Sequence, residues 1–183
     1  GSAYVYVKVD NGGTREWARG SDLNLNPNTN LPYVTDDDSN YGRALKLYVE
    51  KDRDGVVVEE LVFVCAAAEN LNGVNNGVLR VFRRDQSEPN RASGWELDQS
   101  DIIANPTGIQ SNELFCSSVD YNGEYLAVGA AADDNRRGSV FIFKRQGGAW
   151  IEVQTLKPSD TAATSEWFFG GSLDLDGDRL AVG

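Results

Sequence analysis

Short apolar stretches separated by polar, glycine-containing turns run along the whole chain and recur in a fixed order. Three of them begin with glycine and continue as an apolar strand: "GSAYVYVK" at 1–8, "GVLRVFRR" at 77–84 and "GSVFIFKR" at 138–145. Each is followed by a second segment with one tryptophan, which is Trp17, Trp95 or Trp150. Strands that are apolar at successive positions, such as residues 140–143, are expected where both faces of a sheet are covered.

Each tryptophan segment is followed by two further segments that predict a β-hairpin. The first opens with an aromatic and a small residue: Tyr41-Gly42, Phe115-Cys116 or Phe169-Gly170. The second is one of the runs "LVFVCAAA", "YLAVGAAA" and "RLAVG", which end in small residues. The turn between them is Asp54-Gly55, Asn122-Gly123 or Asp176-Gly177. Because Asp-Gly and Asn-Gly favour the positive φ angles of tight turns, every copy predicts a hairpin at the same place.

These segments divide the chain into three repeat units, at about 1–76, 77–137 and 138–183, within a single domain. Small residues such as Gly129, Ala130 and Ala131 would let neighbouring backbones approach closely. Four strands per unit, with unit packed against unit, predict an all-β fold built from β-propeller blades. Each blade is expected to be a four-stranded antiparallel sheet, and few helices are expected.

Two stretches carry a resemblance to a known family: "FFGGSLDLDGDRLAVG" at 168–183 and "FCSSVDYNGEYLAVGAAADDNRRGSVFIF" at 115–143. They resemble the FG-GAP repeat of integrin α-like propellers, which is named for Phe-Gly at one strand start and Gly-Ala-Pro at the end of the next. The first unit departs from this pattern with Tyr41-Gly42 and Cys65-Ala66, and no unit keeps the proline. The resemblance implies a β-propeller from an extracellular or secretory-lumen protein.

With the strands of a family blade labelled A to D, the chain is expected to hold C-D, A-B-C-D, A-B-C-D and A-B. That order gives twelve strands, in two whole and two half blades. Propellers typically close with about four to eight blades, so the chain is expected to be a segment of a larger propeller. The alternative is an open arc whose strand edges are covered by partner chains, because bare edges invite aggregation.

Charge and composition exclude several classes of function. Acidic residues outnumber basic ones by 28 to 17, for a net charge of −11. Such a surface repels nucleic acid and anionic lipid heads, so neither is an expected partner. No apolar run approaches the roughly 18 residues of a membrane span. The chain has no histidine, which excludes a Ser/His/Asp or Cys/His relay and a histidine metal site.

One acidic hairpin is a candidate calcium site. The family often binds calcium in the A-B hairpin through a pattern like D-x-D-x-D-G-x-x-D, and alternating carboxylates around a tight turn can converge on one ion. The nearest match is "EKDRDGVVVEEL", in which the candidate ligands are Glu50, Asp52, Asp54 and Glu59. The alternative is a solvated acidic hairpin without a cofactor. The sequences of the other two hairpins, at 120–124 and 174–178, favour a two-residue turn over a metal site.

Cys65 and Cys116 fall at corresponding ends of an A-B hairpin in successive units. Cys65 stands where the second unit has Gly129, and Cys116 stands where the third has Gly170. Because strands A and B run antiparallel, the end of B and the start of A lie at the same end of a blade. The two thiols are therefore expected to face each other across adjacent blades. A disulfide and two free buried cysteines are both compatible with this placement.

The longest irregular stretch, residues 18–40, is inserted between two strands of the first unit. Its polar candidates for partner binding are Asn26, Asn28, Asn30, Asp36, Asp37 and Asp38. Long loops in a compact fold often carry contacts, although a polar loop with no role has the same composition. The tryptophans recur once per repeat, which favours packing within each blade over an exposed sugar platform.

Together these features favour a non-enzymatic scaffold or adhesion module. Such a module would present propeller loops to a protein or glycan partner, or would pack against flanking blades. Two alternatives stay open: a propeller hydrolase with paired carboxylates in a central pocket, and a calcium-stabilised structural subunit of a larger assembly. No motif singles out two carboxylates, so no catalytic residue is predicted.

Overall fold

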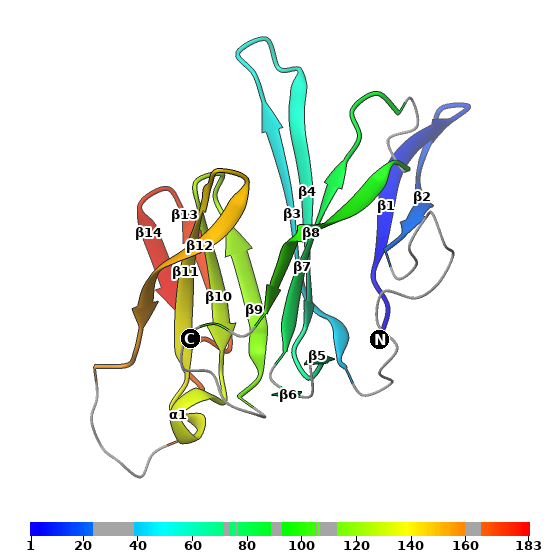
Figure 1. Ribbon diagram of the computed structural model, residues 1–183. Coiled ribbons are helices and arrows are strands. Elements are labelled where there is room, and N and C mark those ends of the chain that lie inside the picture. The colour runs from blue at the N-terminus through cyan, green and yellow to red at the C-terminus, as the bar shows by residue number, and fades with distance from the viewer. Residues whose placement is uncertain are drawn as a thin grey trace.

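The computed structural model describes residues 1–23, 39–71, 74–75, 77–88, 93–104, 106, 113–159 and 166–183. These residues form fourteen strands and one short helix (Figure 1). The elements are β1 Tyr4–Asn11, β2 Thr14–Asp22, β3 Tyr41–Lys51, β4 Val57–Ala66, β5 Asn70–Leu71, β6 Val74–Asn75, β7 Val78–Arg84, β8 Trp95–Ala104, β9 Phe115–Tyr121, β10 Tyr125–Ala130, α1 Asp133–Arg136, β11 Ser139–Gln146, β12 Ala149–Leu156, β13 Leu173–Asp176 and β14 Arg179–Val182.

Two four-stranded antiparallel sheets stand side by side in the molecule (Figure 1). The sheet that we call blade 1 has the strand order β3-β4-β7-β8, and blade 2 has the order β9-β10-β11-β12. Hairpin β1-β2 lies beside blade 1, and hairpin β13-β14 lies beside blade 2. The predicted all-β fold, with two whole and two half blades, is confirmed. Helix α1 and the two-residue strands β5 and β6 are additions to the predicted strands.

Strand β4 shows why successive positions of a strand are apolar. Phe63 and Cys65 belong to a core between the two blades, whereas Val62 and Val64 belong to a second core on the opposite face of blade 1. Side chains alternate between the two faces of a strand, so both faces of this strand are covered. The strand is therefore apolar at successive positions because both of its faces are buried.

The glycine that opens each apolar run abuts the following blade. A Cβ atom added to any of these glycines would overlap a backbone carbonyl oxygen of the next blade. That oxygen belongs to the aromatic residue at the start of the blade's first strand. The three contacts are Gly1 to Tyr41, Gly77 to Phe115 and Gly138 to Phe169. The repeated glycine is therefore a requirement of blade-to-blade packing.

The second repeated contact joins the end of one hairpin to the start of the next blade. Cys65 of β4 and Cys116 of β9 form a disulfide, with their Cα atoms 5.2 Å apart. At the same place between blade 2 and hairpin β13-β14, Gly129 lies against the carbonyl of Gly170, which accepts a 2.7 Å hydrogen bond from Ser118 Oγ. Between blade 2 and hairpin β13-β14, two glycines allow the backbones to approach closely. At the corresponding place between blades 1 and 2, two cysteines form a covalent bond.

A buried carboxylate ties together the inner strands of three successive units. Asp120 of β9 lies 2.5 Å from Lys46 Nζ of β3, and its other oxygen accepts the backbone N–H of Leu175 of β13 at 2.6 Å. Because Asp120 is buried, both partners satisfy a charge that would otherwise be costly in the core.

The tryptophan prediction holds for two units and is wrong for the first. Trp150 is buried between the blades, with its ring centroid 5.8 Å from that of Phe63 and 5.5 Å from that of Tyr121. Trp95 is buried as well, but Trp17 is 69% exposed. The reason is that no sheet among the described residues stands against β1-β2 in the way that blade 1 stands against blade 2.

Tyr121 lies at the centre of the aromatic contacts between the blades. Its ring centroid is 5.0 Å from that of Phe63 and 4.8 Å from that of Tyr48, and its hydroxyl donates to the carbonyl of Gly123 at 2.8 Å. Burial raises the pKa of Tyr121 to about 12, and the nearby carboxylate of Glu59 adds to the increase. The folded state therefore keeps this phenol protonated at a pH where the unfolded chain ionises it.

We expect alkaline pH to destabilise the blade interface through Tyr121. The unfolded phenol releases its proton near pH 10, so stability is full below that pH and falls as the pH rises toward about 12. Urea unfolding at about pH 9 and about pH 11.5 should show a loss roughly 2 kcal/mol larger for the wild type than for Tyr121→Phe. Tyr125→Phe, at a surface position, is the matched control and should keep the wild-type pH dependence. Equal losses in wild type and Tyr121→Phe would contradict the assignment.

Candidate functional site

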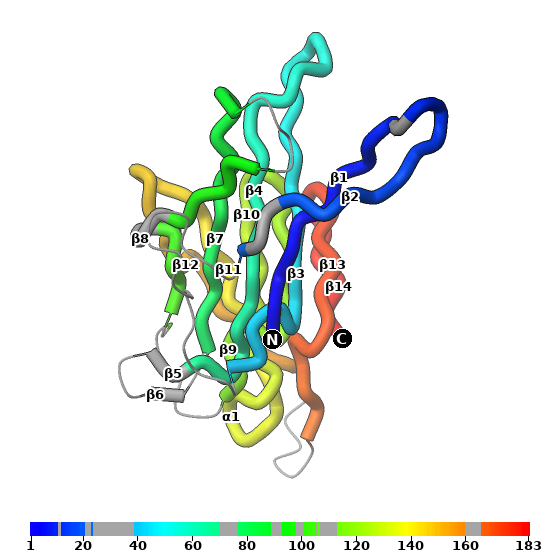
Figure 2. Tube along the Cα trace, turned by 90° about the vertical axis from the view of Figure 1, so that its right-hand side faces the viewer, coloured from blue at the N-terminus to red at the C-terminus, as the bar shows by residue number. Residues whose placement is uncertain are grey.

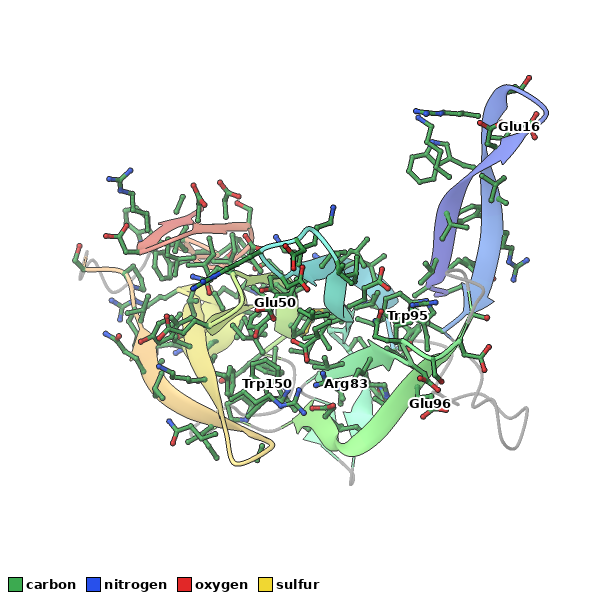
Figure 3. All side chains as sticks on the ribbon, turned by 90° about the horizontal axis from the view of Figure 1, so that it is seen from above. Glu16, Glu50, Arg83, Trp95, Glu96 and Trp150 are labelled. Carbon is green, nitrogen blue, oxygen red and sulfur yellow. A yellow bond between two sulfur atoms is a disulfide. The ribbon has the colours of Figure 1, made fainter. Side chains whose placement is uncertain are left out.

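An open groove of about 490 Å³ separates hairpin β1-β2 from blade 1. In Figure 2 the hairpin leans away from β3, and in Figure 3 Trp95 lies on the side of blade 1 that faces the hairpin. The groove is lined by Val5, Tyr6, Val7, Lys8, Val9, Trp17, Leu47, Val49, Glu60 and Trp95.

Strand β3 supplies one wall of the groove, and its sequence explains why the wall is apolar. Residues 45, 47 and 49 are apolar and exposed, and they alternate with less exposed neighbours along the strand. Leu47 is 56% exposed, whereas its counterpart in the next unit, Tyr121 of β9, is buried against blade 1. The same repeat position is thus covered in one blade and open in the other.

The hairpin supplies the opposite wall. Tyr6 and Val9 on β1 are exposed apolar side chains, and Trp17 on β2 lies opposite Lys8 in the antiparallel register. Tyr6 is exposed where its repeat counterparts Phe82 and Phe143 are buried. Trp17 is exposed where Trp95 and Trp150 are buried.

The floor of the groove carries its polar groups. Trp95 is 6% exposed, and its Nε1 has no hydrogen-bond acceptor in the described part of the chain. The corresponding nitrogen of Trp150 donates to Asp101 Oδ1 at 3.1 Å. Glu60 lies beside the groove in a buried ion pair, with its carboxylate 3.1 Å from Arg84. The groove therefore offers large apolar walls and few polar groups, which suits an apolar partner better than catalysis.

The four candidate calcium ligands are not brought together around an ion. Glu50 and Glu59 lie opposite each other in the β3-β4 register, but Glu59 forms an ion pair with Arg83. Asp52 Oδ1 accepts the backbone N–H of Asp54 at 2.9 Å and that of Val56 at 2.8 Å. Among the described residues no group of three or more acidic or cysteine side chains has metal-binding geometry. In this structure Asp52 braces the turn and Glu59 pairs with a cation, and calcium binding at this hairpin stays a prediction.

The partner-binding candidates of the long insertion lie outside the described residues: Asn26, Asn28, Asn30, Asp36, Asp37 and Asp38. The residues that the sequence reasoning missed are Leu47, Val49 and the exposed face of hairpin β1-β2. The alternating pattern "RALKLYVE" on β3 was a readable signal for an apolar face. What it could not show is that this face is left uncovered.

Antiparallel four-stranded sheets packed face to face through the same repeated contacts define the blades of a β-propeller. Comparison with protein families agrees with this class. The model of the FG-GAP repeat matches residues 98–143, so this part of the chain is similar to that repeat. The matched residues run from β8 to β11, so the sequence repeat is offset from the structural blade. No curated protein matches the chain. In the described part, none of the helices has the length and apolar character needed to cross a membrane.

Proposed function

We propose that the chain is a non-enzymatic interaction module that contributes propeller blades and binds a protein partner in the groove between β1-β2 and blade 1. The observation that carries the proposal is the apolar surface of both walls, where Trp17 and Leu47 are each more than half exposed. Apolar surface gathered in a groove marks an interaction site more often than scattered exposed side chains do.

The groove suits a protein better than a glycan. In the described chain β1 pairs only with β2, and β3 pairs only with β4, so each strand has one edge to which no described strand is paired. An extended segment can add to such an edge through main-chain hydrogen bonds while its side chains fill apolar pockets. A sugar needs several polar partners, and the polar groups that line the groove are chiefly Lys8, Glu60 and the Trp95 indole nitrogen.

The buried carboxylates support a non-enzymatic role. Glu60 is paired with Arg84, Glu69 with Arg80, and Asp120 with Lys46. A carboxylate held in a buried ion pair satisfies the charge of its neighbour, which is a structural use of the group. The disulfide between Cys65 and Cys116 and the FG-GAP repeat support an extracellular or secretory-lumen location, where disulfides persist.

A ligand screen with groove variants tests this function. The immobilised chain is exposed to a displayed library of random peptides and, in parallel, to a glycan array. We expect peptides with alternating apolar residues to be retained, and Leu47→Lys to weaken them at least about tenfold, which corresponds to about 1.4 kcal/mol. Val153→Lys is the matched control, because Val153 is an exposed apolar residue on β12, far along the chain from the groove residues. Glycan binding that Leu47→Lys leaves unchanged would contradict the proposal.

A further inference from the structure

We propose that Asn122 is a site of spontaneous deamidation in the folded protein, and that the reaction breaks a contact between two neighbouring units. Asn122 is followed by Gly123 in the turn that joins β9 to β10. The turn belongs to blade 2 and contributes no residue to the groove. The inference therefore goes beyond the proposed function and does not depend on it.

Three hydrogen bonds hold the side-chain amide of Asn122. Its Oδ1 accepts the backbone N–H of Glu124 at 3.0 Å and that of Tyr125 at 2.8 Å. Its Nδ2 donates to the carbonyl of Gly177 at 2.7 Å, in the turn of the β13-β14 hairpin. Exchanging the two amide atoms would set the NH2 group against two N–H donors, so this pattern of hydrogen bonds fixes the orientation of the amide.

Deamidation of asparagine begins when the backbone nitrogen of the next residue attacks the side-chain carbonyl carbon. Here the nitrogen of Gly123 would form a bond to Cγ of Asn122 and give up its proton. The bond from Cγ to Nδ2 breaks, and Nδ2 takes up a proton and leaves as ammonia. Water then opens the cyclic imide to aspartate or isoaspartate. The overall change consumes one water and releases one ammonia, without oxidation or reduction.

The hydrogen bonds of the turn favour this attack. Negative charge develops on Oδ1 as the new bond forms, and the N–H groups of Glu124 and Tyr125 already point at that atom. Hydrogen bonds to a charged oxygen are stronger than those to a neutral one, so they stabilise the attacked state more than the starting amide. The carbonyl of Gly177 in turn accepts a hydrogen bond from the nitrogen that leaves.

Gly123 supplies an accessible nitrogen. It is exposed, it has no Cβ atom to hinder the attack, and its φ is 98°. None of the hydrogen bonds within the described residues uses its N–H. Asn135 in α1 is also exposed, but it is followed by Arg136, whose side chain hinders the same attack. Asn135 is therefore a reference for an asparagine that lacks these features.

Either product breaks the contact between the two turns. An ionised aspartate has no N–H donor, and its carboxylate would face the carbonyl of Gly177. Isoaspartate also lengthens the backbone and changes the turn itself. We therefore expect deamidation to loosen the β13-β14 hairpin from blade 2. The N–H of Leu175 can report this, because it donates to Asp120 Oδ2 across the same interface.

Peptide mapping of the incubated chain tests the reaction. The whole chain is kept at mildly alkaline pH, either native or unfolded in guanidinium chloride, and the products are identified by mass spectrometry. We expect Asn122 to react at least as fast in the native chain as in the unfolded chain, and at least about tenfold faster than Asn135 in the same native sample. A slower reaction of Asn122 in the native chain, or a rate no higher than that of Asn135, would overturn the inference.

Hydrogen exchange at Leu175 tests the consequence. Asn122→Asp carries one product of the reaction, and Asn135→Asp is the matched control, because it adds the same charge in α1, at the opposite end of blade 2 (Figure 1). We expect the Leu175 amide to exchange about tenfold faster in Asn122→Asp than in the wild type, and at the wild-type rate in Asn135→Asp. Equal exchange in all three chains would overturn the expected loosening of the hairpin.

Discussion

Phe63→Ala is expected to lower the free energy of unfolding by about 4 kcal/mol. Phe63 is fully buried in the core between the blades, where its ring contacts those of Tyr121 and Trp150. Truncation removes the favourable burial of the ring and leaves a cavity that the two packed sheets can close only in part. Because domains of this size are stable by about 5–15 kcal/mol, the loss would be a large share of the total.

Urea unfolding followed by circular dichroism measures this loss. Phe168→Ala is the matched control, since Phe168 is 43% exposed and its removal should cost less than about 1 kcal/mol. A similar small effect at both positions would mean that Phe63 is not at the interface of two packed blades.

Loss of the Cys65–Cys116 disulfide is expected to cost about 4 kcal/mol. The bond closes a loop of 51 residues in sequence separation, which restricts the unfolded chain, and it fastens β4 of blade 1 to β9 of blade 2. Replacement by Cys65→Ala with Cys116→Ala removes the cross-link and leaves alanine at a position whose φ is 67°. Alanine is strained there just as the wild-type cysteine is, so the double alanine variant measures the loss of the cross-link alone.

Cys65→Ala with Cys116→Gly removes the cross-link and also relieves the backbone strain at residue 116. Glycine accepts a positive φ without strain, as Gly42 and Gly170 do at the corresponding positions. This variant should be about 1 kcal/mol more stable than the double alanine variant and should still fall below the oxidised wild type. Equal stability of the oxidised and reduced wild type would contradict the expected contribution.

The sequence was sufficient to predict the strands and their order because local signals determine them. Asp54-Gly55, Asn122-Gly123 and Asp176-Gly177 set the hairpin turns, and the glycine at the start of each strand of type C recurs because it abuts the next blade. Each of these requirements involves only a few residues. The turn dipeptides and glycines that meet them therefore recur at corresponding positions of the repeat.

The burial of Trp17 and the ion pairs could not be predicted in the same way. Whether Trp17 is covered depends on a neighbouring blade, not on its own strand. The pair of Arg80 with Glu69, which has an N–O distance of 2.5 Å, and that of Lys46 with Asp120 join side chains from different segments. Nothing in the local sequence distinguishes such buried charges from solvated ones.

The side-chain contacts of the candidate calcium hairpin could not be predicted from its motif. The spacing of Glu50, Asp52, Asp54 and Glu59 resembles a metal loop, but the turn and Arg83 use two of the carboxylates. The groove could not be predicted either, because no motif marks it. It is lined by side chains of blade strands that resemble the other strands of the repeat. What turns them into a candidate binding surface is the absence of a covering hairpin among the described residues.

Peptide mapping of the oxidised protein tests the stacking of the blades most directly. The chain is produced in an oxidising compartment, alkylated without reduction and digested, and its disulfide-linked peptides are identified by mass spectrometry. Blade 1 and blade 2, packed as described, predict one intrachain bond between Cys65 and Cys116. Two alkylated thiols, or a bond from either cysteine to another chain, would contradict the packing of β4 against the start of β9.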